Sequence, residues 1–184
     1  ASPLATSFVI LNKAQKRAGC VLVNIGAETT SLVVFEDSTP ISLKIFPVGS
    51  NDVTNDIALG LKVTIEEAEK IKRGSMTSAT FSKKRLDEII HNRFNSIFGL
   101  IDLHLKKIKR DGLLPAGIIL TGGGAQFPGF TVAITRTLNL TAILGDPWAR
   151  VAYPTELKPV LDTLAGTFAI SIGLALREIE VTGK

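Results

Sequence analysis

Three short segments of the sequence combine residues that could hold a phosphorylated ligand. The first is residues 24–30, Asn-Ile-Gly-Ala-Glu-Thr-Thr, which stand between two apolar runs. Gly26 would let the backbone approach a phosphate closely, and the hydroxyls of Thr29 and Thr30 can donate to its oxygens. Taken alone, the segment is more often an ordinary hairpin turn that needs one glycine.

The second segment is residues 120–129, Leu-Thr-Gly-Gly-Gly-Ala-Gln-Phe-Pro-Gly. Gly122, Gly123 and Gly124 leave room for a flat ring or a sugar, and a helix N-terminus that follows them would be electropositive. The segment lacks the Gly-Lys-Ser/Thr of a Walker A loop, and Phe127 stands where the last glycine of a dinucleotide-binding fingerprint belongs. The simpler alternative is a glycine-rich loop without a ligand.

The third segment is a charged stretch, residues 66–73. Glu69 and Lys72 are three residues apart, so on a helix they share one face. By itself this spacing is typical of a solvated ion pair on a helix surface.

The composition gives little support for a reactive cysteine, a metal site or a nucleic-acid partner. The single cysteine, Cys20, opens an apolar run and is expected to be a buried hydrophobic side chain, and one cysteine excludes a multi-cysteine metal site. His91 and His104 are thirteen residues apart on one expected helix, too far around its axis to share a metal. Basic residues interleaved with stacking aromatics are absent, so we expect no nucleic-acid partner.

The net charge of +4 is unevenly distributed along the 184 residues. Residues 62–110 hold 12 basic and 6 acidic side chains, a net of +6, which leaves −2 for the remainder. Lys83, Lys84 and Arg85 begin the long helix expected in this segment, and a basic surface there could attract an acidic partner.

Hydrophobic periodicity predicts the elements that position these residues. Period-two or continuously apolar runs predict strands at residues 20–25, 31–35, 41–46, 117–120 and 141–144. Apolar residues at spacings of three and four predict helices at about 51–61, 64–72, 82–110, 128–138 and 159–177. Three strands in a meander, followed by strands that alternate with helices, indicate an α/β fold with a ribonuclease H-like mixed five-stranded sheet, flanking helices and an inserted helical lobe.

The apolar stretch 161–176 near the end contains Asp162, Thr163, Thr167 and Ser171. We expect it to be too short and too polar to cross a membrane.

Together, the segments resemble domain II of an actin-like ATPase, most closely the bacterial division protein FtsA. The resemblance rests on five stretches in the right order, 20–36, 47–61, 66–74, 120–129 and 168–178, which span most of the chain. It implies a connector helix at 1–18 from a missing first half, a ribonuclease H-like subdomain (IIA) at 19–50 and 111–184, and an inserted helical subdomain (IIB) at 51–110.

The resemblance also implies which residues contact ATP. The hairpin turn would be the second phosphate loop, with Gly26, Thr29 and Thr30. Glu69 and Lys72 would flank the adenosine, and the triglycine loop at Gly122, Gly123 and Gly124 would border the adenine and ribose. Gly49 and Asn51, at the bend into the inserted lobe, would approach the phosphates.

Two departures from the family pattern concern the phosphate loop. Asn24 stands where the family usually has Asp, and a neutral amide is a poorer ligand than a carboxylate for Mg²⁺, so we place Asn24 at the nucleotide with a weak, water-mediated contact to the metal. Glu28 adds a negative charge near the expected phosphate. We therefore expect nucleotide binding, and at most weak ATPase activity.

For the whole protein, the resemblance implies a cytoplasmic cell division protein at the inner face of the membrane. It would form filaments with itself, bind the membrane through a tail absent here, and tether the tubulin-like FtsZ, whose C-terminal tail would dock at Lys83, Lys84 and Arg85. Two alternatives remain open: a PilM-like pilus-assembly protein or degenerate actin-like adaptor that binds partner peptides with little ATP hydrolysis, and half of a sugar or acetate kinase.

Overall fold

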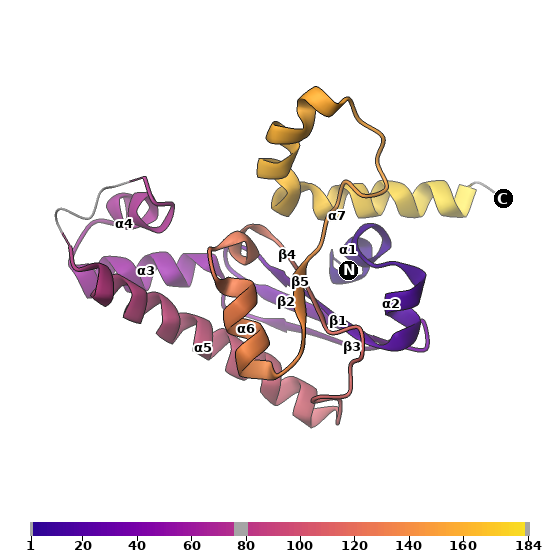
Figure 1. The fold of residues 1–184 in the computed structure, drawn as a ribbon, viewed down its shortest axis with the longest axis horizontal. Helices are drawn as coiled ribbons and strands as arrows, with labels where there is room; N and C mark the ends of the chain where they lie inside the picture. Colours follow the sequence, from indigo (N-terminus) through magenta and orange to yellow (C-terminus); the bar gives the residue numbers. More distant parts are fainter. Residues whose placement is uncertain (1, 76–80, 183–184) are drawn as a thin grey trace.

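The protein is built around one mixed sheet of five strands (Figure 1). The structure, a computed structural model, describes residues 2–75 and 81–182. The sheet order is β3-β2-β1-β4-β5, and the bounds are β1 Cys20–Ile25, β2 Thr30–Glu36, β3 Thr39–Phe46, β4 Ile118–Thr121 and β5 Ala142–Leu144. β1, β2 and β3 pair antiparallel, whereas β1–β4 and β4–β5 pair parallel. The predicted mixed five-stranded sheet is confirmed.

Seven α-helices accompany the sheet in the described part of the chain. They are α1 Ser2–Ile10, α2 Lys13–Ala18, α3 Ser50–Leu61, α4 Ile65–Lys72, α5 Lys83–Lys107, α6 Phe130–Leu138 and α7 Lys158–Thr182. The first stretch of the chain, expected to be the end of a helix and a connector, thus forms two short helices. α6 begins at Phe130, two residues after Pro128, because a 3₁₀ turn at Gly123–Gln126 follows β4 first.

Alternating side chains of the central strands divide the core into two clusters, one on each face of the sheet. The larger cluster joins Val21, Val23 and Ile25 of β1 to α3, α4, α5 and α6. The smaller cluster joins Cys20 and Leu22 of β1 to the end of α1. Figure 1 shows α1 and α7 together on one side of the sheet and α5 and α6 on the other.

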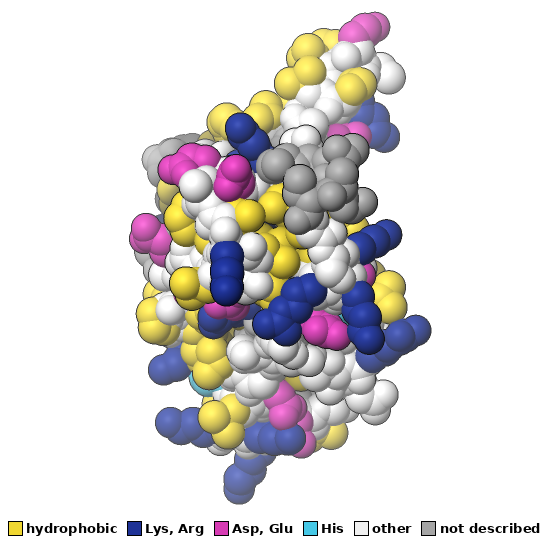
Figure 2. Space-filling model, turned by 90° about the vertical axis from the view of Figure 1, so that its left-hand side faces the viewer, with side chains coloured by type: hydrophobic (Ala, Val, Ile, Leu, Met, Phe, Trp, Pro, Cys, Tyr) yellow, Lys and Arg dark blue, Asp and Glu magenta, His cyan; other side chains and the backbone are white. Residues whose placement is uncertain are grey.

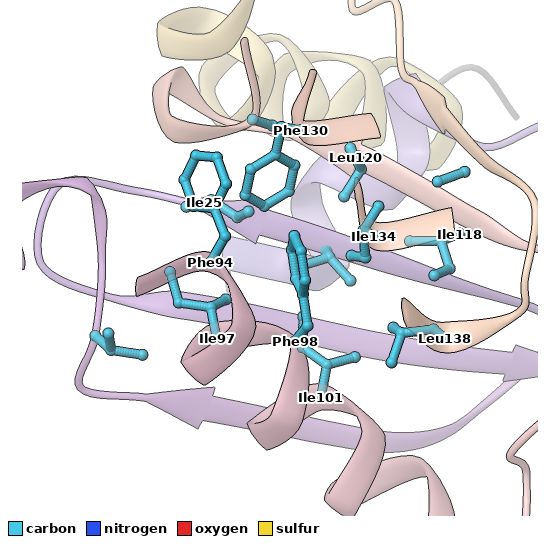
Figure 3. Close-up of a cluster of buried hydrophobic side chains, with 14 of the residues drawn as sticks. Ile25, Phe94, Ile97, Phe98, Ile101, Ile118, Leu120, Phe130, Ile134 and Leu138 are labelled. Carbon is cyan, nitrogen blue, oxygen red and sulfur yellow. The ribbon is translucent and has the colours of Figure 1, made fainter. Parts of the chain in front are cut away.

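An aromatic group holds α5 against α6 and the loop before it (Figure 3). The Phe94 ring packs edge-on against Phe130 and Phe127, with centroids 4.7 and 5.2 Å apart, and Phe98 packs against Phe130 at 5.0 Å. Edge-to-face aromatic pairs at these separations are favourable beyond their buried area. The long helix is thereby fixed to the layer that carries the triglycine loop.

α7 is longer than the sequence predicts and changes one expectation. The segment Thr155–Arg177, which joins a 3₁₀ turn at Thr155–Leu157 to most of α7, has a mean hydropathy of 1.6 and, among the described residues, is long and apolar enough to cross a membrane by length and composition alone. The expectation that this stretch is too short and too polar is therefore wrong on that criterion. Only 11% of its most apolar window is buried, although Gly173 packs on the backbone of Ala5 in α1.

Candidate functional site

The turn between β1 and β2 is fastened to the start of α3 by backbone hydrogen bonds. The amide of Ser50 donates to the carbonyl of Gly26 at 2.9 Å, and the amide of Asn51 donates to the carbonyl of Ala27 at 2.8 Å. Gly49 must be glycine, because a Cβ there would collide with the Ala27 backbone. The turn therefore has a fixed position relative to α3. The backbone amides of Ser50 and Asn51 already donate hydrogen bonds to the turn.

Asn24 and Thr30 flank this turn, and only one of the two side chains is free to form a hydrogen bond with a ligand. The Asn24 side chain is half-buried beside Gly122, and no residue of the described chain forms a hydrogen bond with it. Thr30 is fully buried, and its hydroxyl donates to the carbonyl of Val48 at 2.8 Å. Ala27, Glu28 and Thr29 are exposed. The free amide of Asn24 and the exposed hydroxyl of Thr29 are thus the polar groups available to a ligand.

The triglycine loop leaves the end of β4 directly beside β1, where Thr121 is the register partner of Asn24. Gly122 has a φ of 90°, and a Cβ there would collide with Asn24 and the Ile25 carbonyl. A Cβ at Gly124 would collide with the Ile25 side chain. Gly123 is exposed and a Cβ there would have no neighbour within 4 Å, so packing within the protein does not require this glycine.

Glu69 and Lys72 form a compact network that the sequence only partly predicts. Lys72 Nζ lies 2.6 Å from Glu69 Oε2 and donates to Thr54 Oγ1 at 2.7 Å and to the Ser50 carbonyl at 3.3 Å. Thr54 donates to Glu69 Oε2 at 2.7 Å, and Arg73 donates to Glu69 Oε1 at 2.8 Å. The pair is thus tied to the first turn of α3, and not solvated as an isolated ion pair would be.

The network controls the protonation of Glu69. Burial alone would raise the pKa of this carboxyl, but hydrogen bonds from Lys72, Arg73 and Thr54 outweigh burial and lower the pKa to about 2. Glu69 is therefore ionised at any physiological pH. Sequence reasoning missed Thr54, because its role depends on how α3 and α4 pack, which no local motif encodes.

A hollow of about 290 Å³ adjoins the triglycine loop at the carboxyl ends of β4 and β5. Its wall includes Gly122, Gln126 and Asp146, and Asp162 and Gly166 of α7 complete it. Gly166 touches the backbone of Gly122 and Gly123 so closely that a Cβ would not fit. The sequence analysis did not select Asp146, Asp162 or Gly166, although ligands of parallel sheets commonly lie beyond the carboxyl ends of the strands.

The expected partner-binding residues Lys83, Lys84 and Arg85 form the first turn of α5, and all three are exposed. Arg85 lies 3.7 Å from Glu88, and Ser82 caps the helix by accepting from the Arg85 amide at 3.4 Å. Lys83 and Lys84 line a shallow hollow of about 470 Å³ together with Asp87, Glu88, His91 and Asn92. Figure 2 shows several Lys and Arg side chains on this end of the molecule.

The first three segments meet at the end of β1, and the basic cluster is separate. Asn24 touches the triglycine loop, the 24–30 turn bonds to the start of α3, and α3 bonds to Lys72. The arrangement offers an amide, a hydroxyl, an ammonium and an open glycine, which suits a phosphorylated ligand with a flat ring. Within residues 2–75 and 81–182, no group of three or more His, Cys, Asp or Glu side chains could hold a metal by itself.

Comparisons with known proteins place this geometry in a family. The family model described as Cell division protein FtsA matches residues 21–173. Cell division protein FtsA of Pseudomonas aeruginosa is 27% identical over 79% of the chain, and that of Borreliella burgdorferi is 31% identical over 78%. In both cases the match spans 40% of the relative's length.

Solved structures share the fold. The chain resembles the PilM–PilN type IV pilus biogenesis complex with a TM-score of 0.79 and 24% identity, over 96% of this chain and 51% of that one. It resembles MreB 5 of Spiroplasma citri bound to AMPPNP with a TM-score of 0.76 and 14% identity, over 99% of this chain and 59% of that one. At these identities the likeness establishes an actin-like ATPase fold.

Proposed function

Because the chain belongs to the FtsA family of cell division proteins, we propose that it is the nucleotide-binding half of an actin-like division protein. Within that protein it would bind ATP with Mg²⁺ at the end of β1. The whole protein would form filaments and tether the tubulin-like FtsZ ring at the septum, on the cytoplasmic face of the membrane. The chain covers 40% of its relatives, so these activities belong to the longer protein.

The observation that carries ATP binding is the open glycine at position 123. Its neighbours Gly122 and Gly124 are required by contacts with Asn24 and Ile25, whereas Gly123 faces open space. A residue without a side chain, exposed at the carboxyl end of a buried strand, leaves a flat surface for the base and sugar. The base would extend toward the hollow lined by Gln126.

The phosphates would lie at the turn between β1 and β2. Thr29 can donate its hydroxyl, Asn24 its amide, and Lys72 supplies a positive charge from the inserted segment. The Lys72 side chain is only 12% exposed and is already bonded to Glu69 and Thr54. Its ammonium would therefore stabilise the phosphates by its positive charge from a fixed position, and not by moving to contact them. Mg²⁺, when bound, would offset phosphate charge, and Asn24 would contact it through water.

The basic first turn of α5 would bind the C-terminal tail of FtsZ. Lys83, Lys84 and Arg85 are exposed and belong to the part of the chain with a net charge of +6. Exposed charges of one sign accelerate encounter with a partner of opposite sign and make the affinity depend on salt.

A second candidate, an actin-like adaptor that binds nucleotide without hydrolysing it, is favoured by Asn24 and by the occupied amides of Ser50 and Asn51. Both features remove groups that would otherwise bind Mg²⁺ or phosphate. In this case ATP would bind, and phosphate release would not exceed the rate without protein. A PilM-like pilus-assembly protein would be such an adaptor.

Titration of a fluorescent ATP analogue, with and without Mg²⁺, into the longest natural chain that contains this sequence tests the proposal. Saturable binding is expected, and its absence in both conditions would overturn the proposal. Gly123→Leu should weaken binding at least ~10-fold, because the side chain would occupy the space assigned to the base. Gly99→Leu is the matched control, since Gly99 lies exposed in α5 with no atom within 4 Å of a Cβ, and its affinity should equal that of the wild type.

A further inference from the structure

Several backbone amides around the turn between β1 and β2 already donate within the protein. The Gly26 amide donates to the Thr29 carbonyl at 2.9 Å, inside the turn itself. The amides of Ser50 and Asn51 donate to carbonyls of the turn at 2.9 and 2.8 Å. Unpaired amides at the start of a helix are the groups that commonly bind a phosphate. In this protein the first two amides of α3 are not available for that purpose.

Two further donors beside the turn are bonded as well. The Gly49 amide, directly before α3, donates to Asp52 Oδ2 at 2.8 Å. The hydroxyl of Thr30, which is fully buried, donates to the Val48 carbonyl at 2.8 Å. Neither donor can bind a ligand unless a hydrogen bond within the protein breaks first, and that loss would offset the gain.

The ammonium of Lys72 also has its acceptors within the protein. An ammonium has three N–H donors. Lys72 Nζ lies 2.6 Å from Glu69 Oε2 and 2.7 Å from Thr54 Oγ1, and it donates to the Ser50 carbonyl at 3.3 Å. Arg73 also pairs with Glu69, but its side chain is 72% exposed, so solvent screens its charge. Lys72 can therefore act on a ligand through its charge, which Glu69 partly offsets, and not through a hydrogen bond.

The donors that remain lie at the tip of the turn and at the end of β1. In the described part of the chain, nothing pairs with the backbone amides of Ala27, Glu28 and Thr29, the Thr29 hydroxyl or the side-chain amide of Asn24. These donors could satisfy about one phosphate group, which has three terminal oxygens. Glu28 is exposed and forms no ion pair with any described residue. Its negative charge therefore lies beside the same donors without a positive partner.

We propose that Glu28 makes this site favour nucleoside diphosphates over nucleoside triphosphates when no metal ion offsets the phosphate charge. The inference rests on the proposed nucleotide site and names the ligand class that this site prefers. A triphosphate carries about one negative charge more than a diphosphate, so Glu28 repels it more strongly. The few remaining donors do not compensate for the additional phosphate. Mg²⁺ bound to the phosphates would reduce both their charge and the preference.

The size of the preference follows from the distance between the charges. In any rotamer the Glu28 carboxylate lies within about one Debye length, ~8 Å, of the turn amides. Two unit charges ~7 Å apart, at an effective dielectric constant of about 40–80, change an affinity about 3- to 10-fold. In a chelator we therefore expect ADP to bind about 3- to 10-fold more tightly than ATP. Contacts with the base and the ribose are common to the two nucleotides and cancel in this ratio.

Titration of ADP and of ATP, each in chelator and in excess Mg²⁺, into the longest natural chain that contains this sequence tests the inference. In the wild type, ADP should bind about 3- to 10-fold more tightly in chelator, and the difference should be smaller in Mg²⁺. Glu28→Gln keeps the size of this exposed side chain and removes its charge, so the two affinities in chelator should become nearly equal. Glu28→Asp keeps the charge and should keep the preference of the wild type.

Asp111→Asn is the control, because Asp111 is exposed in the loop that precedes β4, whereas the triglycine loop follows β4. It removes the same charge and should leave the ratio of the two affinities unchanged. A Glu28→Gln variant with the ratio of the wild type, or a wild type that binds ATP at least as tightly as ADP in chelator, overturns this inference but leaves the proposed nucleotide site intact. If neither nucleotide saturates the protein in either condition, the proposed function fails and this inference fails with it.

Salt dependence separates repulsion by charge from a steric limit on the third phosphate. Raising NaCl from about 0.1 to about 1 M shortens the Debye length from about 10 to about 3 Å. The ratio of the two affinities in chelator should therefore fall toward one in the wild type and stay near one in Glu28→Gln. A wild-type ratio that does not change with salt would overturn the role assigned to the charge of Glu28.

Discussion

Gly122, Gly123 and Gly124 are adjacent and identical in the sequence, yet the structure requires them for different reasons. Gly122 has a left-handed φ and Gly124 sits against Ile25, so both are explained by the fold. A Cβ at Gly123 would meet no atom within 4 Å, so contacts within the described residues do not require glycine there. The sequence singled out the loop as a candidate site, but the distinction among its three glycines required the positions of Asn24 and Ile25 in β1, which are distant in the sequence.

Asn24 is the residue whose substitution should most change the metal chemistry of the proposed site. Asn24→Asp introduces a carboxylate, which Mg²⁺ prefers to an amide. Since one charge-assisted contact contributes roughly 1.5–3 kcal/mol, ATP affinity in the presence of Mg²⁺ should rise at least ~10-fold and affinity without Mg²⁺ should fall. Nucleotide titrations in Mg²⁺ and in chelator measure both effects.

Asn55→Asp is the control for that substitution, because Asn55 is exposed on α3. It should leave the ratio of the two affinities unchanged. If Asn24→Asp also leaves the ratio unchanged, then Asn24 does not lie at the metal.

Glu69 should contribute to stability in a defined pH range. Its pKa is lowered from 4.5 to about 2, so the contribution is complete above pH 4.5 and disappears as the pH falls toward 2. Because the side chain is 32% exposed, solvent screening reduces the effect, and we expect Glu69→Gln to lower the free energy of unfolding by about 1 kcal/mol at pH 7. Urea denaturation at pH 7, 4 and 3 should show the difference between variant and wild type shrinking.

Glu66→Gln provides the comparison, since Glu66 lies exposed on the same helix. Its unfolding free energy should stay near that of the wild type at each pH. A Glu69→Gln variant as stable as Glu66→Gln at pH 7 would show that the network with Lys72 and Thr54 does not stabilise the fold.

At the scale of helices and strands, the sequence predicted the strands closely and the ends of the helices less well. The apolar runs identify all five strands because alternating or continuous apolar patterns are local properties. The pattern predicted α7 from about 159 to 177, which matches its start, but α7 continues to Thr182. The close approach of α7 to α1 depends on Gly173, and no local rule assigns a glycine inside a helix to a contact.

Gly173→Ala should therefore destabilise the protein. Although alanine is the better helix former, the new Cβ would collide with the Ala5 backbone and force α1 and α7 apart, at a net cost of about 2 kcal/mol. A fall in Tm of roughly 4–8 °C is expected for a chain of this size, measured by thermal unfolding. Gly99→Ala meets no neighbour and should instead raise the Tm slightly.

At the scale of the whole molecule, charge is concentrated where a partner is proposed. Reversal of Lys83, Lys84 and Arg85 to Glu should weaken binding of the FtsZ tail peptide at least ~10-fold and reduce the dependence of affinity on salt. Fluorescence anisotropy with the labelled peptide at 50 and 300 mM NaCl measures both.

A matched triple reversal at Lys13, Arg17 and Lys107, which are exposed elsewhere, changes the net charge equally. It should alter the affinity far less. Equal losses in the two triple variants would indicate attraction by net charge and not a docking surface on α5.

The fold class could be anticipated from the order of motifs along the chain, and so could the proximity of the first two ligand segments, because these two motifs follow β1 and β4 of one sheet. Thr54 and Gly166 could not be anticipated, since each reaches the candidate site only through packing between elements distant in sequence. The exposure of Leu43 could not be anticipated either, because it follows from the position of β3 at the edge of the sheet.

The hydrogen bonds from Ser50 and Asn51 to the 26–27 turn have a mechanical consequence. Because two hydrogen bonds join the start of α3 to the turn, a tilt of α3 would either break them or move the turn with the helix. Lys72 of α4 also donates to the Ser50 carbonyl at the start of α3, and Phe94 of α5 packs against Phe130 of α6. We therefore expect a displacement of α3 to move the backbone at Gly26 and Ala27 with it.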